Sequence, residues 1–392
     1  MFESSKARTA SLIVTLAVTV VLGIQAGVAS AQQEGAREVD EPEVAARAWA
    51  VADLRSGEYL AGEGASRELP MASTTKIMAA LVVLEEADLD EEVEISKNAA
   101  SYATPAYSNV GPLPGDTLSV RELLMAALIS SGDDAAYALA EHVGGGGKAG
   151  VGRFVGEMNE RARASGLKHT YFENPVGFDA RGHYSSARDL ARAARLAMQN
   201  PEFRKVVSTE YATIDTPYRE IPLTSTNDLL FIYGPATGIK TGTTPDAGES
   251  LVSSASREDE SYVCVVLDAR EDRFEASERV LRYGFAAHDR KNFVVEGERY
   301  AGIDVPYRRG ETVDLVARES VDGLVDASPD VERDVDLVDD PPDSATAGTR
   351  LGEVVVKVDE KKVGETGLLA KKGYEKASLG QRVWYTVEGI FE

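Results

Sequence analysis

The sequence predicts an α+β fold followed by a small all-β unit, and the order of its segments carries that prediction. Strand-like segments stand at both ends of residues 44–288, with a long helical block between them. That order is typical of one sheet assembled from both ends of a unit, with helices around it. Near residue 291 the pattern changes to short alternating segments separated by Gly and Pro, so we expect residues 289–378 to form a β-rich unit.

The individual elements of the first unit follow from local patterns. Residues 44–51 form the first expected strand, and a turn at 53–58 leads into a second. Pro70 precedes a helix over 73–86 that is apolar on most sides, which indicates a central, buried helix. Further signals are a capping box from Ser119 to Glu122, glycine helix ends at 144–147 and 166, an amphipathic helix over 186–198, strands at 237–240, 250–255 and 262–267, and a helix over 274–283.

The β-rich unit and the tail after it have weaker signals. Residues 352–373 resemble a hairpin with its turn at 359–362, and the acidic stretch 339–343 is expected to be an exposed loop. The tail, 379–392, is too short to span a bilayer, so it lies on a membrane surface, docks onto the β unit or forms a last strand. If it is helical, one face carries Leu379, Val383, Trp384, Val387, Ile390 and Phe391.

The first 31 residues have the pattern of a secretory signal peptide. Lys6 and Arg8 precede an apolar run from Leu12 to Val28, and the small residues Ala29-Ser30-Ala31 follow. The run is short and interrupted by polar residues, which favours a cleaved signal over a membrane anchor. Residues 32–43 suit a linker. We therefore expect an exported protein that acts at the outer face of the cytoplasmic membrane, in the cell wall space or after secretion.

Composition excludes several classes of function. The chain has 42 Lys and Arg against 65 Asp and Glu, and this negative balance argues against nucleic acid as a partner. Cys264 is the only cysteine, so neither an internal disulfide nor a thiolate metal site is expected, and its apolar surroundings predict burial. The four histidines form no metal-binding pattern. We expect no metal and no cofactor.

Chemistry is first indicated by Ser73-Thr74-Thr75-Lys76. On a helix, residues three apart lie on the same face, so the hydroxyl of Ser73 and the amine of Lys76 are expected in contact. Ser165-Gly166-Leu167-Lys168 also matches this pattern. The first copy differs because it follows Pro70 and begins a buried helix, where free backbone N–H groups favour the negative charge that develops in acyl transfer.

Two further motifs complete the set. Lys240-Thr241-Gly242 lies on an expected strand, where it supplies a second cation that lowers the pKa of Lys76 and a glycine that permits close approach of an extended peptide. Ser131-Gly132-Asp133 lies at a helix junction between the other two motifs. Ser225-Thr226-Asn227 is a competing match for this third motif, and we favour Ser131.

The three motifs, in this order and after a secretory signal, resemble the signature of penicillin-binding proteins. Their surroundings are similar to the low-molecular-mass serine D-alanyl-D-alanine carboxypeptidases, a family with a β-lactamase/DD-peptidase-like fold. The resemblance covers about residues 44–287, and more loosely the β unit, which resembles that family's pedestal domain. It rests on Pro70 to Met78, Asn174-Pro175-Val176-Gly177, His183-Tyr184-Ser185, Gly238 to Gly242 and Tyr283-Gly284-Phe285.

The resemblance implies a mechanism and a substrate. Ser73 would attack the carbonyl between the two terminal D-alanines of a peptidoglycan stem peptide, Lys76 would accept its proton, and Ser131 would relay a proton to the leaving amine. The oxyanion would lie between the N–H groups of Ser73 and Thr243. β-Lactams would acylate the same serine. The implied substrate-binding residues are Asp133, Lys240, Thr241, Gly242, Thr243 and Arg273, the last completing a site for the terminal carboxylate.

One residue departs from the family pattern, and two other functions compete. Asp133 stands where the family usually has asparagine, and an ionised carboxylate would hold a neighbouring lysine in its charged form. A class A β-lactamase would share the three motifs but needs a glutamate-activated water, which Glu173-Asn174-Pro175 superficially resembles. A non-catalytic penicillin-binding sensor is the other alternative, although the retained serine and lysines argue against it.

Overall fold

The computed structural model describes residues 39–216, 218–325 and 329–388. The expected signal peptide (1–31), most of the linker (32–43), and Ile390 and Phe391 lie outside the described residues. Within these three ranges no helix combines the length and the apolar character that crossing a membrane requires.

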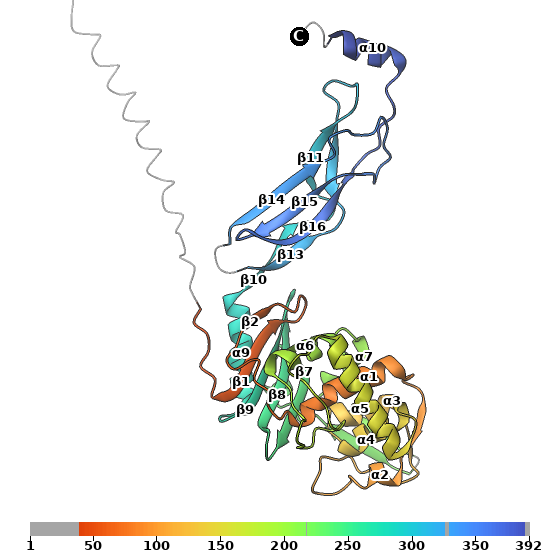
Figure 1. The fold of residues 1–392 in the computed structure, drawn as a ribbon, viewed down its shortest axis with the longest axis vertical. Helices are drawn as coiled ribbons and strands as arrows, with labels where there is room; N and C mark the ends of the chain where they lie inside the picture. The colour runs from red at the N-terminus through yellow and green to blue at the C-terminus, as the bar shows by residue number, and fades with distance from the viewer. Residues whose placement is uncertain (1–38, 217, 326–328, 389–392) are drawn as a thin grey trace, which may run out of the picture. The chain divides into compact units, whose positions relative to one another are not determined.

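A five-stranded antiparallel sheet forms the centre of the first unit (Figure 1). Its strand order is β2-β1-β9-β8-β7. The strands are β1 (Ala46–Asp53), β2 (Tyr59–Ala61), β7 (Ala236–Thr244), β8 (Gly248–Arg257) and β9 (Glu260–Ala269). Because β1 pairs with β9, the sheet joins the two ends of the unit, as the order of segments predicted.

Both faces of this sheet are buried, which explains the long apolar runs of β1 and β9. Successive residues of β9 point to opposite faces. Val263 and Val265 pack against the helical block, whereas Cys264 and Val266 pack against α9 (Arg273–Ala287) on the other face. The predicted burial of Cys264 is confirmed.

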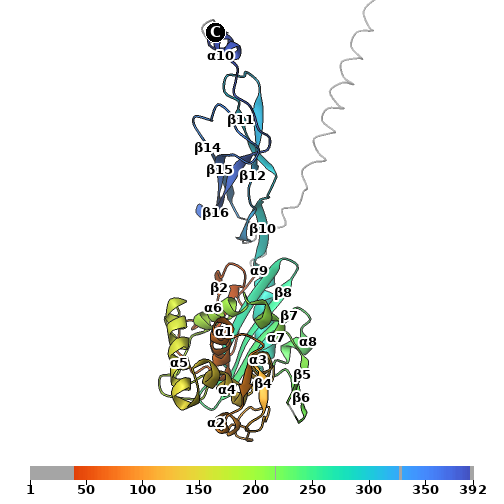
Figure 2. The ribbon, with the colours of Figure 1, turned by 90° about the vertical axis from the view of Figure 1, so that its right-hand side faces the viewer.

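Helices cover the face of the sheet opposite α9 (Figure 2). They are η1 (Ala72–Thr75), α1 (Lys76–Glu86), α2 (Lys97–Ala100), α3 (Val120–Leu128), α4 (Asp133–Val143), α5 (Gly147–Ala164), α6 (Ala187–Ala197) and α7 (Pro201–Val207). The short helix α8 (Leu229–Ile232) instead packs in the same hydrophobic cluster as α9, through Leu229. Two small two-stranded sheets complete the unit, β3 (Glu92–Glu94) with β4 (Thr117–Ser119) and β5 (Tyr211–Asp215) with β6 (Glu220–Thr224).

The central helix behaves as expected, with one difference at its start. Residues 76–83 of α1 are all buried, and the helix contacts α3, α4, α5 and α6. Its first turn is the 3-10 turn η1, so the α-helix begins at Lys76 and not at Ser73. The capping box at Ser119 and Glu122 is present at the start of α3, as predicted. The helix predicted over 274–283 continues to Ala287.

The residues after α9 form two further sheets around a separate hydrophobic cluster. Their strands are β10 (Asp289–Val294), β11 (Arg299–Asp304), β12 (Thr312–Ala317), β13 (Val321–Val325), β14 (Val331–Leu337), β15 (Arg350–Val358) and β16 (Lys361–Ala370). β10 pairs with β13, and the other five follow the order β11-β12-β16-β15-β14. The hairpin expected over 352–373 is confirmed, with Asp359 and Glu360 at positive φ in its turn.

The tail forms α10 (Leu379–Glu388), so the possibility of a last strand was wrong. Arg382 pairs with Asp343 at 2.5 Å and the ring of Tyr385 packs against Tyr307, which anchors one side of α10 to the β unit. The other side stays exposed, with Leu379 at 83% and Trp384 at 64% exposure. Docking and an exposed apolar face therefore coexist in this helix.

Candidate active site

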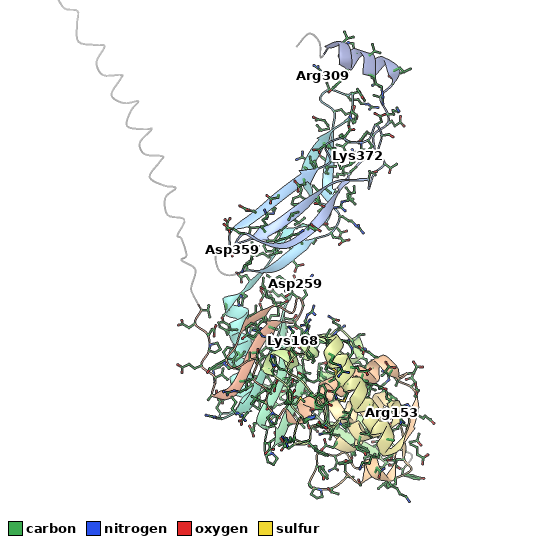
Figure 3. The ribbon with its side chains drawn as sticks, viewed as in Figure 1. Arg153, Lys168, Asp259, Arg309, Asp359 and Lys372 are labelled. Atoms are coloured by element: carbon green, nitrogen blue, oxygen red, sulfur yellow. The ribbon has the colours of Figure 1, made fainter. Side chains whose placement is uncertain are left out.

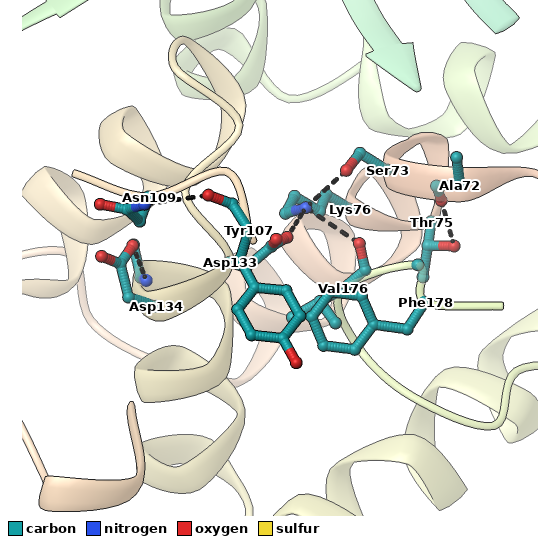
Figure 4. A network of polar contacts seen from close by, with 12 residues as sticks. Ala72, Ser73, Thr75, Lys76, Tyr107, Asn109, Asp133, Asp134, Val176 and Phe178 are labelled. Carbon is teal, nitrogen blue, oxygen red and sulfur yellow. Dashed lines mark hydrogen bonds and ion pairs between the residues drawn. The ribbon is translucent and has the colours of Figure 1, made fainter. Parts of the chain in front are cut away.

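Ser73 and Lys76 meet where η1 passes into α1. The Nζ atom of Lys76 donates a hydrogen bond to Ser73 Oγ at 2.8 Å (Figure 4). Ser73 is half-buried, whereas Lys76 is 1% exposed. The serine hydroxyl is therefore open to solvent on one side and in contact with an enclosed amine on the other.

Lys76 has two other partners, both supplied from distant segments. Its Nζ atom lies 2.6 Å from Asp133 Oδ1 on the first turn of α4, and donates to the Val176 carbonyl at 2.9 Å. The three contacts fix the amine beside Ser73 and leave it little freedom to turn away (Figure 4).

The Val176 carbonyl was missed by reasoning from the sequence, although the segment that holds it was noticed. Asn174 Oδ1 accepts the backbone N–H groups of Val176, Gly177 and Phe178, which closes a tight turn. Gly177 has a φ of 100°, and a Cβ there would stand 2.0 Å from the Ala72 carbonyl oxygen. Only glycine allows the turn to pack this closely against η1.

Burial has the largest influence on the pKa of Lys76. Burial lowers the pKa of the amine, and the charge and hydrogen bond of Asp133 raise it by less, so the pKa lies below its ordinary value. The expectation that Asp133 holds the lysine charged is thus outweighed by desolvation. A base must be neutral to accept a proton, and burial shifts Lys76 toward that form.

Lys240 brings a second buried amine into the site. Burial lowers its pKa far below the ordinary value, and the nearby charge of Lys76 lowers it further. Its Nζ atom donates to the Thr241 carbonyl at 3.1 Å. A Cβ at Gly242 would stand 3.0 Å from the Met71 carbonyl and 3.1 Å from the Ser73 nitrogen, so glycine lets β7 lie directly beside η1.

Side chains from α9 and from the loop before α8 join this strand. Arg273 Nη1 donates to Thr243 Oγ1 at 2.8 Å, and burial lowers the pKa of its guanidinium. The hydroxyls of Thr241 and Thr226 lie 2.6 Å apart. Thr226 belongs to the competing match Ser225-Thr226-Asn227, so that segment also borders the site, as a neighbour of Thr241 that sequence reasoning did not assign.

Ser131 lies between α3 and α4, two residues from Asp133. It is 5% exposed and has a φ of 62°, a backbone conformation that is uncommon for serine. Such conformations persist only where the surroundings impose them, and they gather at functional sites. Asp133, in contact with Lys76, ties this turn to the catalytic helix.

His183 supports the site as a neutral ring. Its Nδ1 accepts the Glu173 N–H at 3.0 Å, so its Nε2 carries the proton donated to Thr75 Oγ1 at 2.8 Å. Burial lowers the pKa of His183 to about 4. Across the described part of the chain, no group of three His, Cys, Asp or Glu side chains could hold a metal ion.

The second Ser-x-x-Lys match does not form a comparable site. Ser165 lies just after α5 and its hydroxyl accepts from Arg161 Nη1 at 2.7 Å. Lys168 is exposed, outside the helix. The two copies have the same spacing in the sequence, so spacing alone did not separate them. The structure does, because only Ser73 and Lys76 lie on one continuous helical segment.

Comparison with known proteins identifies the family. The D-alanyl-D-alanine carboxypeptidase family matches residues 35–271. The chain belongs to this family. It is a serine peptidase and a low-molecular-mass penicillin-binding protein, as the three motifs indicated.

Relatives cover different shares of the chain. D-alanyl-D-alanine carboxypeptidase DacF of Bacillus subtilis is 29% identical over 94% of this chain and 95% of its own length. DacC of Escherichia coli is 36% identical over 63% of each chain. The first alignment thus spans almost the whole chain, including the β unit, whereas the second covers a smaller share at a higher identity.

Solved structures agree with the fold. The DD-transpeptidase of a Streptomyces strain superposes with a TM-score of 0.60 at 36% identity, over 63% of this chain and all of that one. The carboxypeptidase DacD of Francisella tularensis has a TM-score of 0.66 over 88% of this chain and 98% of its own, at 23% identity. This second likeness shows that the fold, including a β unit, is shared.

Proposed function

We propose that this chain removes the terminal D-alanine from peptidoglycan stem peptides through an acyl-enzyme formed on Ser73. The contact of 2.8 Å between Ser73 Oγ and the buried amine of Lys76 carries the proposal. A neutral amine at that distance is placed to accept the hydroxyl proton as the oxygen attacks. Membership of the family supports the reaction, because its members are D-alanyl-D-alanine carboxypeptidases.

Acylation and hydrolysis are carried out by side chains of the site and water. Ser73 Oγ attacks the carbonyl carbon between the two D-alanines while Lys76 takes its proton, and the oxyanion lies toward the N–H groups of Ser73 and Thr243. Ser131 passes its proton to the amine nitrogen as the C–N bond breaks and takes a proton from Lys76, so D-alanine leaves and Lys76 is neutral again. Water then attacks the ester carbonyl on Ser73 and gives a proton to Lys76. The bond from the carbonyl carbon to Oγ breaks, and Lys76 returns that proton to Ser73 Oγ.

Lys240, Thr241, Thr243 and Arg273 are proposed to bind the terminal carboxylate, next to Asp133 and Gly242. The Nε atom of Arg273 is buried and has no hydrogen-bond partner among the described residues. An unpaired buried donor is costly, and an anionic ligand would satisfy it. Lys240 and Arg273 approach this region from β7 and α9 respectively.

The proposal is tested by incubating the purified protein with a pentapeptide stem that ends in D-alanyl-D-alanine and measuring free D-alanine. Release of one D-alanine per peptide, together with covalent labelling by fluorescent penicillin, is the expected result. A non-catalytic sensor would be labelled and release no D-alanine. Failure of penicillin to label a folded sample, while labelling a positive control, would contradict the serine mechanism itself.

Hydrolysis of a chromogenic cephalosporin separates the enzyme from a β-lactamase. We expect slow turnover, because deacylation in a class A β-lactamase needs a glutamate-activated water. Glu173 is exposed, and its backbone N–H is bound to His183. Rapid, repeated hydrolysis of the cephalosporin would favour the lactamase instead.

Replacing Asp133 by asparagine is expected to keep or raise activity at neutral pH and to move the acidic limb of kcat/KM to lower pH. Activity rises with pH as Lys76 loses its proton, and Asp133 raises the pKa of Lys76. Asparagine removes that influence, so the amine is neutral at lower pH. The measurement is the pH profile of D-alanine release by both proteins.

Asp134→Asn is the matched control for that change. Asp134 neighbours Asp133 on α4, but its carboxylate accepts the N–H groups of Val110, Gly111 and Ala135 and does not contact Lys76. Its charge has a smaller influence on Lys76, so a smaller displacement of the limb is expected. A large fall in turnover for Asp133→Asn would show that the carboxylate has a role of its own.

We further propose that the protein is exported after cleavage at residues 29–31, with residues 44–288 carrying catalysis, and that α10 rests on the outer face of the cytoplasmic membrane. Leu379, Val383, Trp384 and Val387 are exposed on α10, which supports peripheral contact. The charge of −23 supports the absence of nucleic acid among its partners.

Membrane contact is expected to weaken when charges are placed on that face. Leu379→Glu with Trp384→Glu should move the signal-cleaved protein from the membrane fraction of spheroplasts to the soluble fraction. The control is Val363→Glu, which changes a valine of β16 that is 42% exposed and should leave fractionation unchanged. Full solubility of the wild-type protein would contradict the proposal.

A further inference from the structure

A pocket of about 460 Å³ lies near the edge of the central sheet formed by β1 and β2, whereas the catalytic strand β7 forms the other edge. Its walls come from α6, the turn between β1 and β2, and the segment between α5 and α6. None of the proposed catalytic or substrate-binding residues lines it. Four cations do so, and we call this pocket the basic groove; they are Lys168, Arg188, Arg192 and Arg195.

Three of these cations share one face of α6 because of their spacing. Arg188, Arg192 and Arg195 stand at positions i, i+4 and i+7, which fall on one side of a helix. The opposite side of α6 is apolar and packs into the core through Leu190 and Ala194. From the rise of a helix the row is about 10 Å long. Lys168 projects from the segment before α6 (Figure 3).

Neighbouring groups hold these side chains without neutralising them. The guanidinium of Arg188 lies over the ring of Tyr59 at 3.9 Å, and Arg195 Nη2 donates to the Arg55 carbonyl at 2.7 Å. Arg192 stands beside Gly166, where an added Cβ would be 3.4 Å from its Nη1. No ion pair with an Asp or Glu of the described ranges involves any of the four cations.

The two acidic side chains that line the groove already accept hydrogen bonds from other groups. Asp53 accepts from Ser56 through Oδ1 and from Arg290 through Oδ2 at 2.7 Å. Asp189 Oδ2 accepts the His169 N–H at 2.7 Å and the hydroxyl of Thr170 at 2.9 Å. The chain has 65 acidic residues, yet none of those that the structure describes forms an ion pair with these four cations. Their mutual repulsion favours binding of an external anion.

The positive surface continues past the turn between β1 and β2. A second hollow of about 720 Å³ is lined by Arg55, Arg204 and Lys205. Arg55 pairs with Asp322 at 3.1 Å, and its carbonyl accepts the bond from Arg195, which links the two hollows. The run of cations is therefore longer than one small anion would need, and it suits a chain of repeated negative charges.

We propose that the basic groove binds phosphate groups of an anionic cell-surface polymer. Guanidinium groups bind phosphate through paired N–H donors, and several can act on one tetrahedral group from different sides. Cations from α6 and from Lys168 approach the groove from different elements. The chain as a whole carries −23, a net charge that opposes binding of a polyanion, so local attraction by a cluster of cations such as this groove is required. Such binding would hold the enzyme in the wall and leave Ser73 free.

The test measures binding of the purified full chain to synthetic poly(glycerol phosphate). Wild-type protein should bind, and the affinity should fall as salt rises through a few hundred millimolar. Arg188→Gln with Arg192→Gln should weaken binding by about tenfold, since each exposed charge contributes a modest amount. Arg163→Gln, which removes an exposed arginine of α5, is the matched control and should bind as wild type.

Four outcomes would overturn the proposal. They are no binding by the wild type, equal weakening by Arg163→Gln, binding of glycerol phosphate monomer as tight as the polymer, and either equal binding of poly(glutamate) or a tenfold loss of phosphatidylglycerol-vesicle binding in Arg188→Gln with Arg192→Gln. Release of D-alanine from a soluble pentapeptide should not change in any of these variants. If the double variant is unstable, Arg192→Gln alone keeps the test valid. The side chain of Arg192 makes no hydrogen bond or ion pair with the other described residues, so its loss should not destabilise the fold.

Discussion

Replacing Ser73 by alanine is expected to abolish both release of D-alanine and covalent labelling by penicillin. The hydroxyl is the group that forms the ester, and no other hydroxyl is hydrogen-bonded to Lys76 among the described residues. Loss of a nucleophile of this kind lowers turnover by about a millionfold in a serine protease, so we expect a fall to background. Fold is monitored by thermal unfolding, which should change little at this half-buried position.

Ser165→Ala is the control for that experiment, because Ser165 begins the other Ser-x-x-Lys match. Its hydroxyl accepts from Arg161 and has no contact with a buried amine. Activity and labelling should equal those of the wild type. If Ser73→Ala still reacted with penicillin, or if Ser165→Ala lost the label, the assignment of the nucleophile would be wrong.

Lys76→Met is expected to lower the rate of acylation by penicillin by about 10²- to 10⁴-fold, the usual contribution of a general base. Methionine fills a similar volume but accepts no proton. The change also leaves Asp133 buried and unpaired, which typically costs about 3–5 kcal/mol of unfolding free energy. Rates of labelling and urea unfolding measure the two effects.

The double variant Lys76→Met with Asp133→Asn separates catalysis from stability. Asparagine removes the unpaired charge, so the free energy of unfolding should recover while acylation stays slow. Recovery of both would show that the single variant failed only because it was unstable. Acylation at the wild-type rate by either folded variant would exclude Lys76 as the base.

Local spacing predicted much of the fold and the first half of the site. Ser73 and Lys76 meet because three residues make about one helical turn, a relation that holds in η1 and α1. The capping box at Ser119 and the strand that contains Cys264 were also predicted correctly, because both depend on residues close together in the sequence. The helix after β9 was predicted over 274–283 and was too short, because it continues to Ala287.

Gly284 lies inside this helix, on the side that faces the sheet. A Cβ there would stand 3.1 Å from the ring of Tyr262, so glycine permits a close contact between α9 and β9. A glycine that ends a helix and one that permits a close helix–sheet contact have the same sequence signal.

The sequence by itself determined the order of elements, the buried central helix and the pairing of Ser73 with Lys76, because each depends on neighbours within a few residues. Only the tertiary structure decided that Asp133 and the Val176 carbonyl meet the same amine, from 57 and 100 residues away. It also decided that burial outweighs Asp133 in the pKa of Lys76. Desolvation depends on everything that surrounds a group, and chain closure brings those surroundings from segments whose spacing carries no local signal.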